Sequence, residues 1–180
     1  MVTGPLDLTL LNSAEPAVYS AALAPLFEGA PRFLSHLAAG RPDPDWPSLF
    51  IRARTIAHAM SEDERIELIN AHPRLGAAPE TVSSLSFREQ GYDREPQAGA
   101  RESAELDART VAAELDRLNA AYEARFGFRY CVYVAGRSRA ALLPEVAASL
   151  EAYREPEMRR ALDAVIDIAA ARWSIMSRPA

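Results

Sequence analysis

Apolar residues recur every three or four positions along much of this chain. The clearest case is residues 100–127, "ARESAELDARTVAAELDRLNAAYEARFG", in which the spacing persists from Leu106 to Tyr122. This spacing places apolar side chains on one face of an α-helix. Gly127 suits the end of that helix, because glycine readily adopts the left-handed backbone of a C-terminal cap. The pattern therefore predicts one long helix that ends at Gly127.

Shorter segments with the same periodicity lie on both sides of the long helix. Pro31 suits a first turn, Gly40 suits a helix end, Ser61 and Glu64 fit a capping box, and Ser138 suits an N-cap. The predicted shorter helices cover residues 15–29, 31–39, 48–60, 62–71, 138–153 and 156–173.

Two of these helices carry more specific expectations. In residues 15–29, Val18 belongs to the apolar face, and Pro25 is expected to divide the helix into two pieces. In residues 48–60, Ile51 belongs to the predicted buried face.

Residues 128–134, "FRYCVYV", are the one segment with strand character, because they are aromatic and β-branched. A lone strand has no partner to complete its hydrogen bonds. We expect either an extended, buried segment or a helix whose propensity is overridden. The predicted fold is all-α: a single domain over residues 1–180, with about eight helices and one extended segment near 128–134.

Charge and composition exclude several classes of function. The net charge of −5 and pI near 5.3 provide no basic field for nucleic acid, so no nucleic-acid partner is expected. One cysteine, Cys131, supports neither an intrachain disulfide nor a cysteine zinc cage. No signal peptide and no apolar run long enough for a membrane span are present, so a cytoplasmic protein without membrane association is expected.

His72 stands in "INAHPRLGA", residues 69–77, where the following proline should end the preceding helix. A lone histidine at a helix end is more often a cap or a packed polar group than a catalyst. Pro73, however, fixes the backbone next to it, and the ordinary imidazole pKa of about 6.5 suits proton transfer near neutrality. Both interpretations stay open on the residues alone.

The segment "SFREQ", residues 86–90, also has two interpretations. Ser86 and Glu89 fit a second capping box. Alternatively, Ser86, Glu89 and Gln90 offer donors and acceptors to a polar ligand, and the spacing does not separate the two. His36 and His58 are interpreted as surface or packed residues, since no carboxylate stands near them at ligand spacing. Cys131 is interpreted as an inert core thiol.

Several motifs occur together and in order: "LN" at residues 11–12, "AHPRLG", the Ser-x-x-Glu-Gln of residues 86–90, "LNAAYEARFGFRYCVYVAGRS" and a final "IAAAR". This set resembles the 2-oxo-4-hydroxy-4-carboxy-5-ureidoimidazoline (OHCU) decarboxylases of the purine-to-allantoin pathway. The similarity runs from about residue 6 to residue 175. Its most specific parts are the His-Pro, the Ser-x-x-Glu-Gln and the string from Asn119 to Phe128.

The resemblance implies an all-α fold, a homodimer, no cofactor and no metal, and decarboxylation of the ureidoimidazoline substrate to (S)-allantoin. By this resemblance His72 and Glu89 are the catalytic residues. The substrate would be bound by the backbone at Pro73, by the side chains of Ser86, Gln90 and Arg172, and by the backbone of the segment containing Phe128, Tyr130, Cys131 and Val132.

The chemistry suits these residue types. Loss of CO2 leaves negative charge on the ring, which must be stabilised and then protonated on one face. His72 can shuttle a proton, Glu89 can orient the imidazole or the substrate, and the planar donors of Arg172 suit a carboxylate or a ring carbonyl. A salt bridge is the alternative interpretation of Arg172.

Two features depart from the family pattern. Residues 91–100, "GYDREPQAGA", replace the usual alanine-glycine stretch, and Arg74 could add positive charge beside the site. The alternatives to a decarboxylase are a catalytically silent or substrate-diverged binding module of the same fold and, with little support, a helical metal-binding protein.

Overall fold

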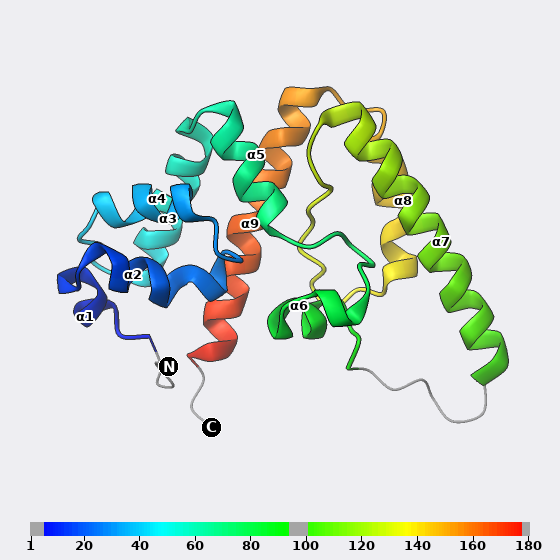
Figure 1. Cartoon of the computed structure of the whole chain (residues 1–180), viewed down its shortest axis with the longest axis horizontal. Helices are drawn as coiled ribbons and strands as arrows, with labels where there is room; N and C mark the ends of the chain where they lie inside the picture. The colour runs from blue at the N-terminus through cyan, green and yellow to red at the C-terminus, as the bar shows by residue number, and fades with distance from the viewer. Residues whose placement is uncertain (1–5, 94–100, 178–180) are drawn as a thin grey trace. The chain divides into compact units, whose positions relative to one another are not determined.

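The computed structural model describes residues 6–93 and 101–177, without the side chains of residues 101–106. This part of the chain is helical and contains no β-strand, which confirms the predicted all-α fold (Figure 1). Its elements are α1 (Leu8–Ser13), α2 (Pro16–Leu23), the 3-10 helix η1 (Ala24–Leu26), α3 (Pro31–Ala39), α4 (Trp46–Ala59), α5 (Glu62–Ala71), the 3-10 helix η2 (Pro79–Thr81), α6 (Ser84–Glu89), α7 (Arg101–Phe126), α8 (Arg139–Ser149) and α9 (Arg154–Met176).

The described residues form two compact units. The first runs up to His72 and resumes at Met158, and the second runs from Pro73 to Glu157. One boundary therefore falls directly after His72, and the other falls inside α9. Most of the segment 91–100, which departs from the family pattern, lies outside the described residues.

The first unit packs α2 against α3, and α3 against α4 and α5 (Figure 1). Its core is aromatic and aliphatic: the rings of Phe27 and Phe33 meet edge to face with centroids 4.9 Å apart. Tyr19, Leu37 and Leu49 of the same unit are fully buried. Each such side chain contributes about 1.5–3 kcal/mol on burial, so this core fixes the helices that carry the polar residues below.

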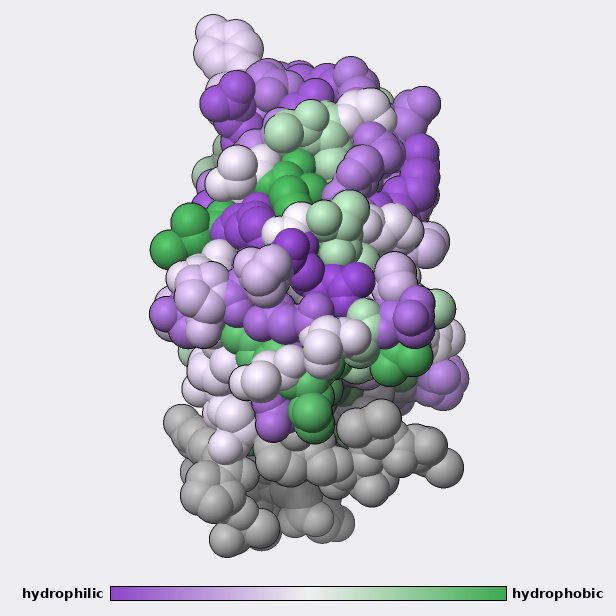
Figure 2. Space-filling model, turned by 90° about the vertical axis from the view of Figure 1, so that its left-hand side faces the viewer, coloured by the Kyte–Doolittle hydropathy of each residue, from purple (hydrophilic) through white to green (hydrophobic). Residues whose placement is uncertain are grey.

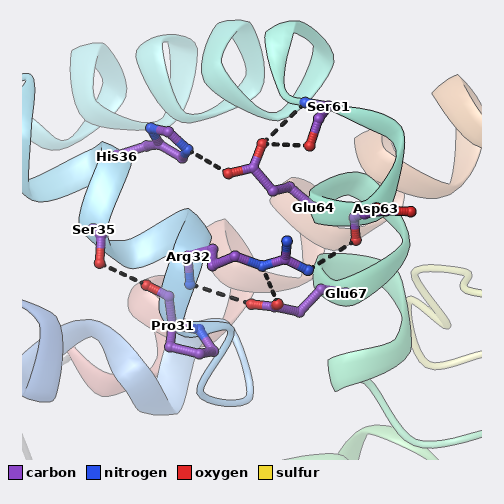
Figure 3. Close-up of polar contacts among 8 residues, drawn as sticks. All are labelled: Pro31, Arg32, Ser35, His36, Ser61, Asp63, Glu64 and Glu67. Atoms are coloured by element: carbon purple, nitrogen blue, oxygen red, sulfur yellow. Dashed lines mark hydrogen bonds and ion pairs between the residues drawn. The ribbon is translucent and has the colours of Figure 1, made fainter.

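A polar network joins α3 to the start of α5 (Figure 3). The predicted capping box is confirmed, since the Ser61 N–H donates to Glu64 and the Ser61 side chain accepts from the helix. The hydrogen bond from His36, with those from Ser61, lowers the pKa of Glu64 from its ordinary 4.5 to about 2. The network fixes the beginning of the helix that ends at His72.

The second unit packs α7 against α8, with the segment after Gly127 between them in the chain (Figure 1). Gly127 has φ +80°, as expected for a helix-ending glycine. The predicted extended segment is confirmed: residues 129–134 are neither helix nor strand. Tyr122 fixes its start by edge-to-face contacts with Phe128 and Tyr130, at centroid distances of 5.7 and 5.2 Å.

Some local predictions are wrong. Val18 and Ile51 were expected on buried faces but are 55% and 69% exposed. The buried residues of α2 are Tyr19 and Leu23, and those of α4 are Leu49, Ala53 and Ala57. The start of α6 also differs: its N-cap is Ser83, which accepts from the Ser86 N–H at 3.2 Å, so Ser86 is no capping residue. The break at Pro25 is confirmed by the change from α2 to η1.

Hydrophobic residues on the face shown in Figure 2 form patches that are separated by hydrophilic residues. In the first unit the exposed large hydrophobic residues come from α1, α2, α4 and the end of α9: Leu10, Val18, Ile51, Ile175 and Met176. A stack of Trp46 on Trp173, with centroids 5.2 Å apart, joins α4 to α9. None of the helices in the described ranges is long and apolar enough to cross a membrane.

Candidate functional site

His72 is the C-cap of α5, where the backbone leaves the helix with φ −76° and ψ 140°. Proline disfavours the helical region for the residue before it, so Pro73 explains this extended conformation. The His72 N–H still donates to the Ile69 carbonyl at 3.2 Å. Only 4% of the residue is exposed. The sequence thus carries an imidazole to the end of a helix and the fold buries it there.

The charge state of His72 follows from this burial. Desolvation, which is the largest cause, and the positive charge of Arg172 lower the pKa of His72 from its ordinary 6.5 to about 4. The charge of Glu28 and a backbone hydrogen bond at Leu68 oppose the shift. Near neutral pH the imidazole is therefore neutral, which is the form that accepts a proton.

Arg172 projects from α9 and is 1% exposed. Its Nη1 donates to the carbonyls of Pro25 and Leu26 at 2.9 and 3.4 Å, and its Nη2 donates to Glu28 Oε1 at 2.8 Å. Arg172 therefore forms a salt bridge, and the pair is buried rather than on a surface. Because the charge of Arg172 also acts on His72, the structure brings these two predicted site residues together.

Glu28 was missed by the sequence reasoning. It stands in "LFEGAP" at the end of the predicted helix 15–29, where a glutamate before glycine looks like an ordinary helix end. No motif in the chain marks it. Its partner Arg172 is 144 positions away, so only the fold reveals the pair.

In the second unit, Gln90 contacts the loop that follows Pro73. Its Oε1 accepts from the Gly76 N–H at 2.7 Å, and its Nε2 donates to the Arg74 carbonyl at 3.2 Å. Gly76 has φ +84°, which suits glycine at this turn. Asn119 on α7 donates to the Leu75 carbonyl at 2.9 Å. The loop after the His-Pro pair is thus held by side chains from α6 and α7.

Arg74 is drawn into an ion pair with Glu123 on α7, and its Nε donates to the carboxylate at 2.7 Å. Its positive charge is therefore largely balanced within the second unit. Arg74 was predicted to add positive charge beside the site, and its ion pair with Glu123 reduces the charge that it can add.

The remaining predicted ligands also belong to the second unit. Ser86 is buried and Glu89 is half-buried on α6. In the extended segment, Phe128, Tyr130 and Cys131 are buried and Val132 is half-buried, and the Tyr130 hydroxyl donates to Glu145 at 3.2 Å. Cys131 is a buried core residue. His72 and Arg172 thus lie in the first unit, and the other predicted site residues in the second.

His36 and His58 have carboxylate partners that the sequence spacing did not show. His36 pairs with Glu64 at 2.9 Å and His58 with Asp163 at 2.8 Å, in each case across two helices. Within residues 6–93 and 101–177, no group of three or more His, Cys, Asp or Glu residues could hold a metal ion.

Comparison with known proteins covers nearly the whole chain. Residues 12–174 match the model of the OHCU decarboxylase family. The chain belongs to this family. A uric acid degradation bifunctional protein of Bacillus subtilis is 30% identical over 159 residues, which are 88% of this chain and 30% of that protein. The 2-oxo-4-hydroxy-4-carboxy-5-ureidoimidazoline decarboxylase of Haloferax volcanii is 27% identical over 169 residues, which are 93% of this chain and 94% of that protein.

A solved structure supports the same fold. A crystal structure of OHCU decarboxylase in the presence of (S)-allantoin superposes with a TM-score of 0.65 at 18% identity, covering 92% of this chain and all of that one. The chain spans about 30% of the length of the Bacillus subtilis protein, so it corresponds to one part of a bifunctional relative and to the whole of a shorter one. The resemblance inferred from the His-Pro and Ser-x-x-Glu-Gln motifs is confirmed.

Proposed function

We propose that this chain decarboxylates 2-oxo-4-hydroxy-4-carboxy-5-ureidoimidazoline to (S)-allantoin during urate degradation. One observation carries the proposal. His72, the histidine that the family resemblance predicts as catalytic, is buried and neutral near pH 7, and the charge of Arg172 lowers its pKa. Membership of the OHCU decarboxylase family supplies the substrate class. A buried neutral base and a buried cation suit an anionic substrate whose reaction requires a proton transfer.

The reaction breaks the bond between the ring carbon and its carboxylate. The electron pair that is left behind forms a double bond to the adjacent ring carbon, and the C=N pair moves onto the nitrogen, which takes up a proton from solvent. The hydroxyl on the first carbon then loses its proton and becomes a carbonyl, so that the pair of the new double bond becomes available to the adjacent carbon. A proton must then reach the adjacent ring carbon on one face. Neutral His72 can accept the hydroxyl proton and deliver a proton to that carbon, and such acid–base help accelerates reactions by about 10²–10⁴-fold.

Arg172 supplies the electrostatic part of the mechanism. A guanidinium donates in a planar fork, which suits the substrate carboxylate and the oxyanion-like charge that follows CO2 loss. Because Arg172 is already hydrogen-bonded to the turn at residues 25–28, its orientation is fixed before the substrate arrives. The site then needs little reorganisation in the transition state.

The finer roles are part of the same proposal. Glu89 orients the imidazole or the substrate, and Ser86, Gln90, the Pro73 backbone and the backbone of residues 128–132 bind the ring and ureido groups. The burial of Ser86 and Gln90 and the helix-free backbone of residues 129–134 support this. Because Gln90 hydrogen-bonds to Arg74 and Gly76, we also propose that it shapes the loop after Pro73.

We also propose that the chain works as a cytoplasmic homodimer without a cofactor and as one domain. The family match from residue 12 to residue 174 runs through both compact units, which supports a single domain. The exposed hydrophobic residues of α1, α2, α4 and α9 are compatible with a protein interface. Sedimentation of the purified chain would test the dimer directly.

The activity is tested with freshly generated substrate, by following its disappearance and the optical activity of the allantoin formed. Wild-type protein should accelerate both, and His72→Ala should remove most of the acceleration, at least about 100-fold. His36→Ala is the matched control, since His36 lies in an exposed pair with Glu64. If folded wild-type protein and His72→Ala are equally inert, the chain is a silent or diverged module instead.

A further inference from the structure

Glu28 occupies a strained position in the turn between η1 and α3. Its φ is +51°, a region that non-glycine residues rarely adopt and that costs about 1–2 kcal/mol. The turn is closed by hydrogen bonds from the Phe27 and Gly29 N–H groups to the Ala24 carbonyl, at 3.2 and 3.0 Å. A residue with a Cβ persists in such a conformation only where its surroundings fix it, and glycine would fit there without strain.

What fixes Glu28 is the far end of its own side chain. Its carboxylate accepts from Arg172 Nη2 at 2.8 Å, and the same guanidinium also donates to the carbonyls of Pro25 and Leu26. All three acceptors therefore come from one turn of four residues. The Arg172 side chain is 1% exposed and the Glu28 side chain 14%. Buried ions are costly unless each is paired, so the two charges depend on each other.

The pair lies close enough to His72 for both charges to act on the imidazole. Arg172, from α9, disfavours protonation of His72, and Glu28, from the turn, favours it. On His72's own helix the backbone at Leu68 also contributes. These are the groups that set the charge state of His72 together with its burial.

We propose that Glu28 is a positioning residue: its carboxylate aligns the Arg172 guanidinium beside His72 and balances its charge, so that the substrate anion meets an oriented cation and an imidazole that still accepts a proton. This inference rests on the proposed decarboxylase function for its substrate. The backbone strain at Glu28, which glycine would avoid, is the energetic cost of placing that carboxylate.

The first test follows protonation of His72 and needs no turnover. The imidazole signals of Glu28→Gln, Arg172→Gln and wild type are titrated by NMR, with His72→Ala used for assignment. Glu28→Gln keeps one oxygen acceptor on a side chain of the same length and removes the charge. In Glu28→Gln the His72 midpoint should fall at least half a pH unit below the wild-type midpoint, expected near 4, or the ring should stay neutral until the protein unfolds. In Arg172→Gln the His72 midpoint should rise by a similar amount.

Glu67→Gln is the matched control, because it removes one negative charge from an arginine pair in the same unit (Figure 3). Its His72 midpoint should equal that of wild type. If His72 in folded Glu28→Gln titrates at or above the wild-type pH, the proposal is wrong.

The second test separates positioning from backbone structure. Glu28→Gly relieves the strain at φ +51° but removes the carboxylate. We expect at least a tenfold loss of kcat/KM in Glu28→Gly and a smaller loss in Glu28→Gln that lies mainly in kcat, because a less basic His72 transfers protons more slowly.

Wild-type kinetics in folded Glu28→Gly would overturn the proposal. If instead the His72 midpoints move as expected but no variant, wild type included, turns over the substrate, Glu28 keeps its positioning role and the proposed function fails.

Discussion

Two clusters in the first unit contain the same residue types and behave differently. In one, between α3 and α5, His36 pairs with Glu64 and Arg32 pairs with Glu67 (Figure 3). In the other, Arg172 pairs with Glu28 beside His72. The His36 side chain is 49% exposed, whereas His72 is almost fully buried. Residue identity alone therefore does not separate a surface network from a candidate site.

Burial changes what each charge does. In the exposed cluster, hydrogen bonds stabilise the ionised carboxylate, so the pKa of Glu64 falls to about 2 while water screens the interaction. In the buried cluster, desolvation disfavours the charged imidazole, so the pKa of His72 falls to about 4. The exposed cluster favours an ionised carboxylate, whereas the buried cluster disfavours a protonated imidazole. Three sets of substitutions test this difference between the two clusters.

The largest difference should appear when an arginine is removed from each cluster. Arg172→Met leaves the Glu28 carboxylate buried and uncompensated, which should cost about 3–5 kcal/mol of unfolding free energy. Arg32→Met, which breaks an exposed pair with Glu67, should cost about 1 kcal/mol or less. Urea unfolding at pH 7 measures both. Equal losses would mean that burial does not distinguish the two clusters.

A smaller effect concerns the pH dependence of stability at His72. Its folded pKa, about 4, lies below the 6.5 of the unfolded chain, so the unfolded state takes up a proton first as the pH falls. Stability is therefore full above pH 6.5 and is lost as the pH falls towards 4. Between pH 7 and 4.5 the loss is about 2 kcal/mol by linkage.

The substitution His72→Gln removes this titration, so its unfolding free energy should depend less on pH over the same interval. Urea unfolding of both proteins at pH 7, 6, 5 and 4.5 measures the difference. Parallel curves for the two proteins would contradict a buried neutral His72.

The smallest effect belongs to Glu64 and occupies a different pH window. Its folded pKa is lowered, so its contribution is present above pH 4.5 and lost as the pH falls towards 2. Glu64→Gln should be less stable than wild type at pH 6, and the gap should narrow below pH 4.5. Added salt should narrow it too, because the pair with His36 is exposed. A gap unaffected by acid and salt would point to lost packing instead.

Local sequence signals predicted most of the helices. The capping box at Ser61, the first turn at Pro31 and the ending at Gly127 depend on neighbouring residues, so they could be read directly. Helix α1 was missed, although Asp7 caps it by accepting from the Thr9 N–H at 2.8 Å. Six residues carry too little periodicity to reveal a helix. Val18 and Ile51 were misplaced because apolar character alone does not state which face is covered.

The candidate site was predictable only in part. His72 and Arg172 were identified from motifs, and the structure brings these two together. Glu28 was not predicted, because its role depends on a partner 144 positions away. The hydrogen bonds of Gln90 to Arg74 and Gly76 were not predicted either, since an amide has the same appearance in sequence whether it binds a ligand or a loop.

By itself the sequence determined the helical fold, the family and the position of an imidazole at a helix end, because periodicity, caps and the effect of proline are local properties of the chain. The tertiary structure decided that His72 is buried and neutral, that Arg172 is held by Glu28, and that His36 remains a surface residue. Those outcomes depend on which side chains exclude water from which charges. Desolvation and pairing arise only when distant segments pack, so no local pattern encodes them.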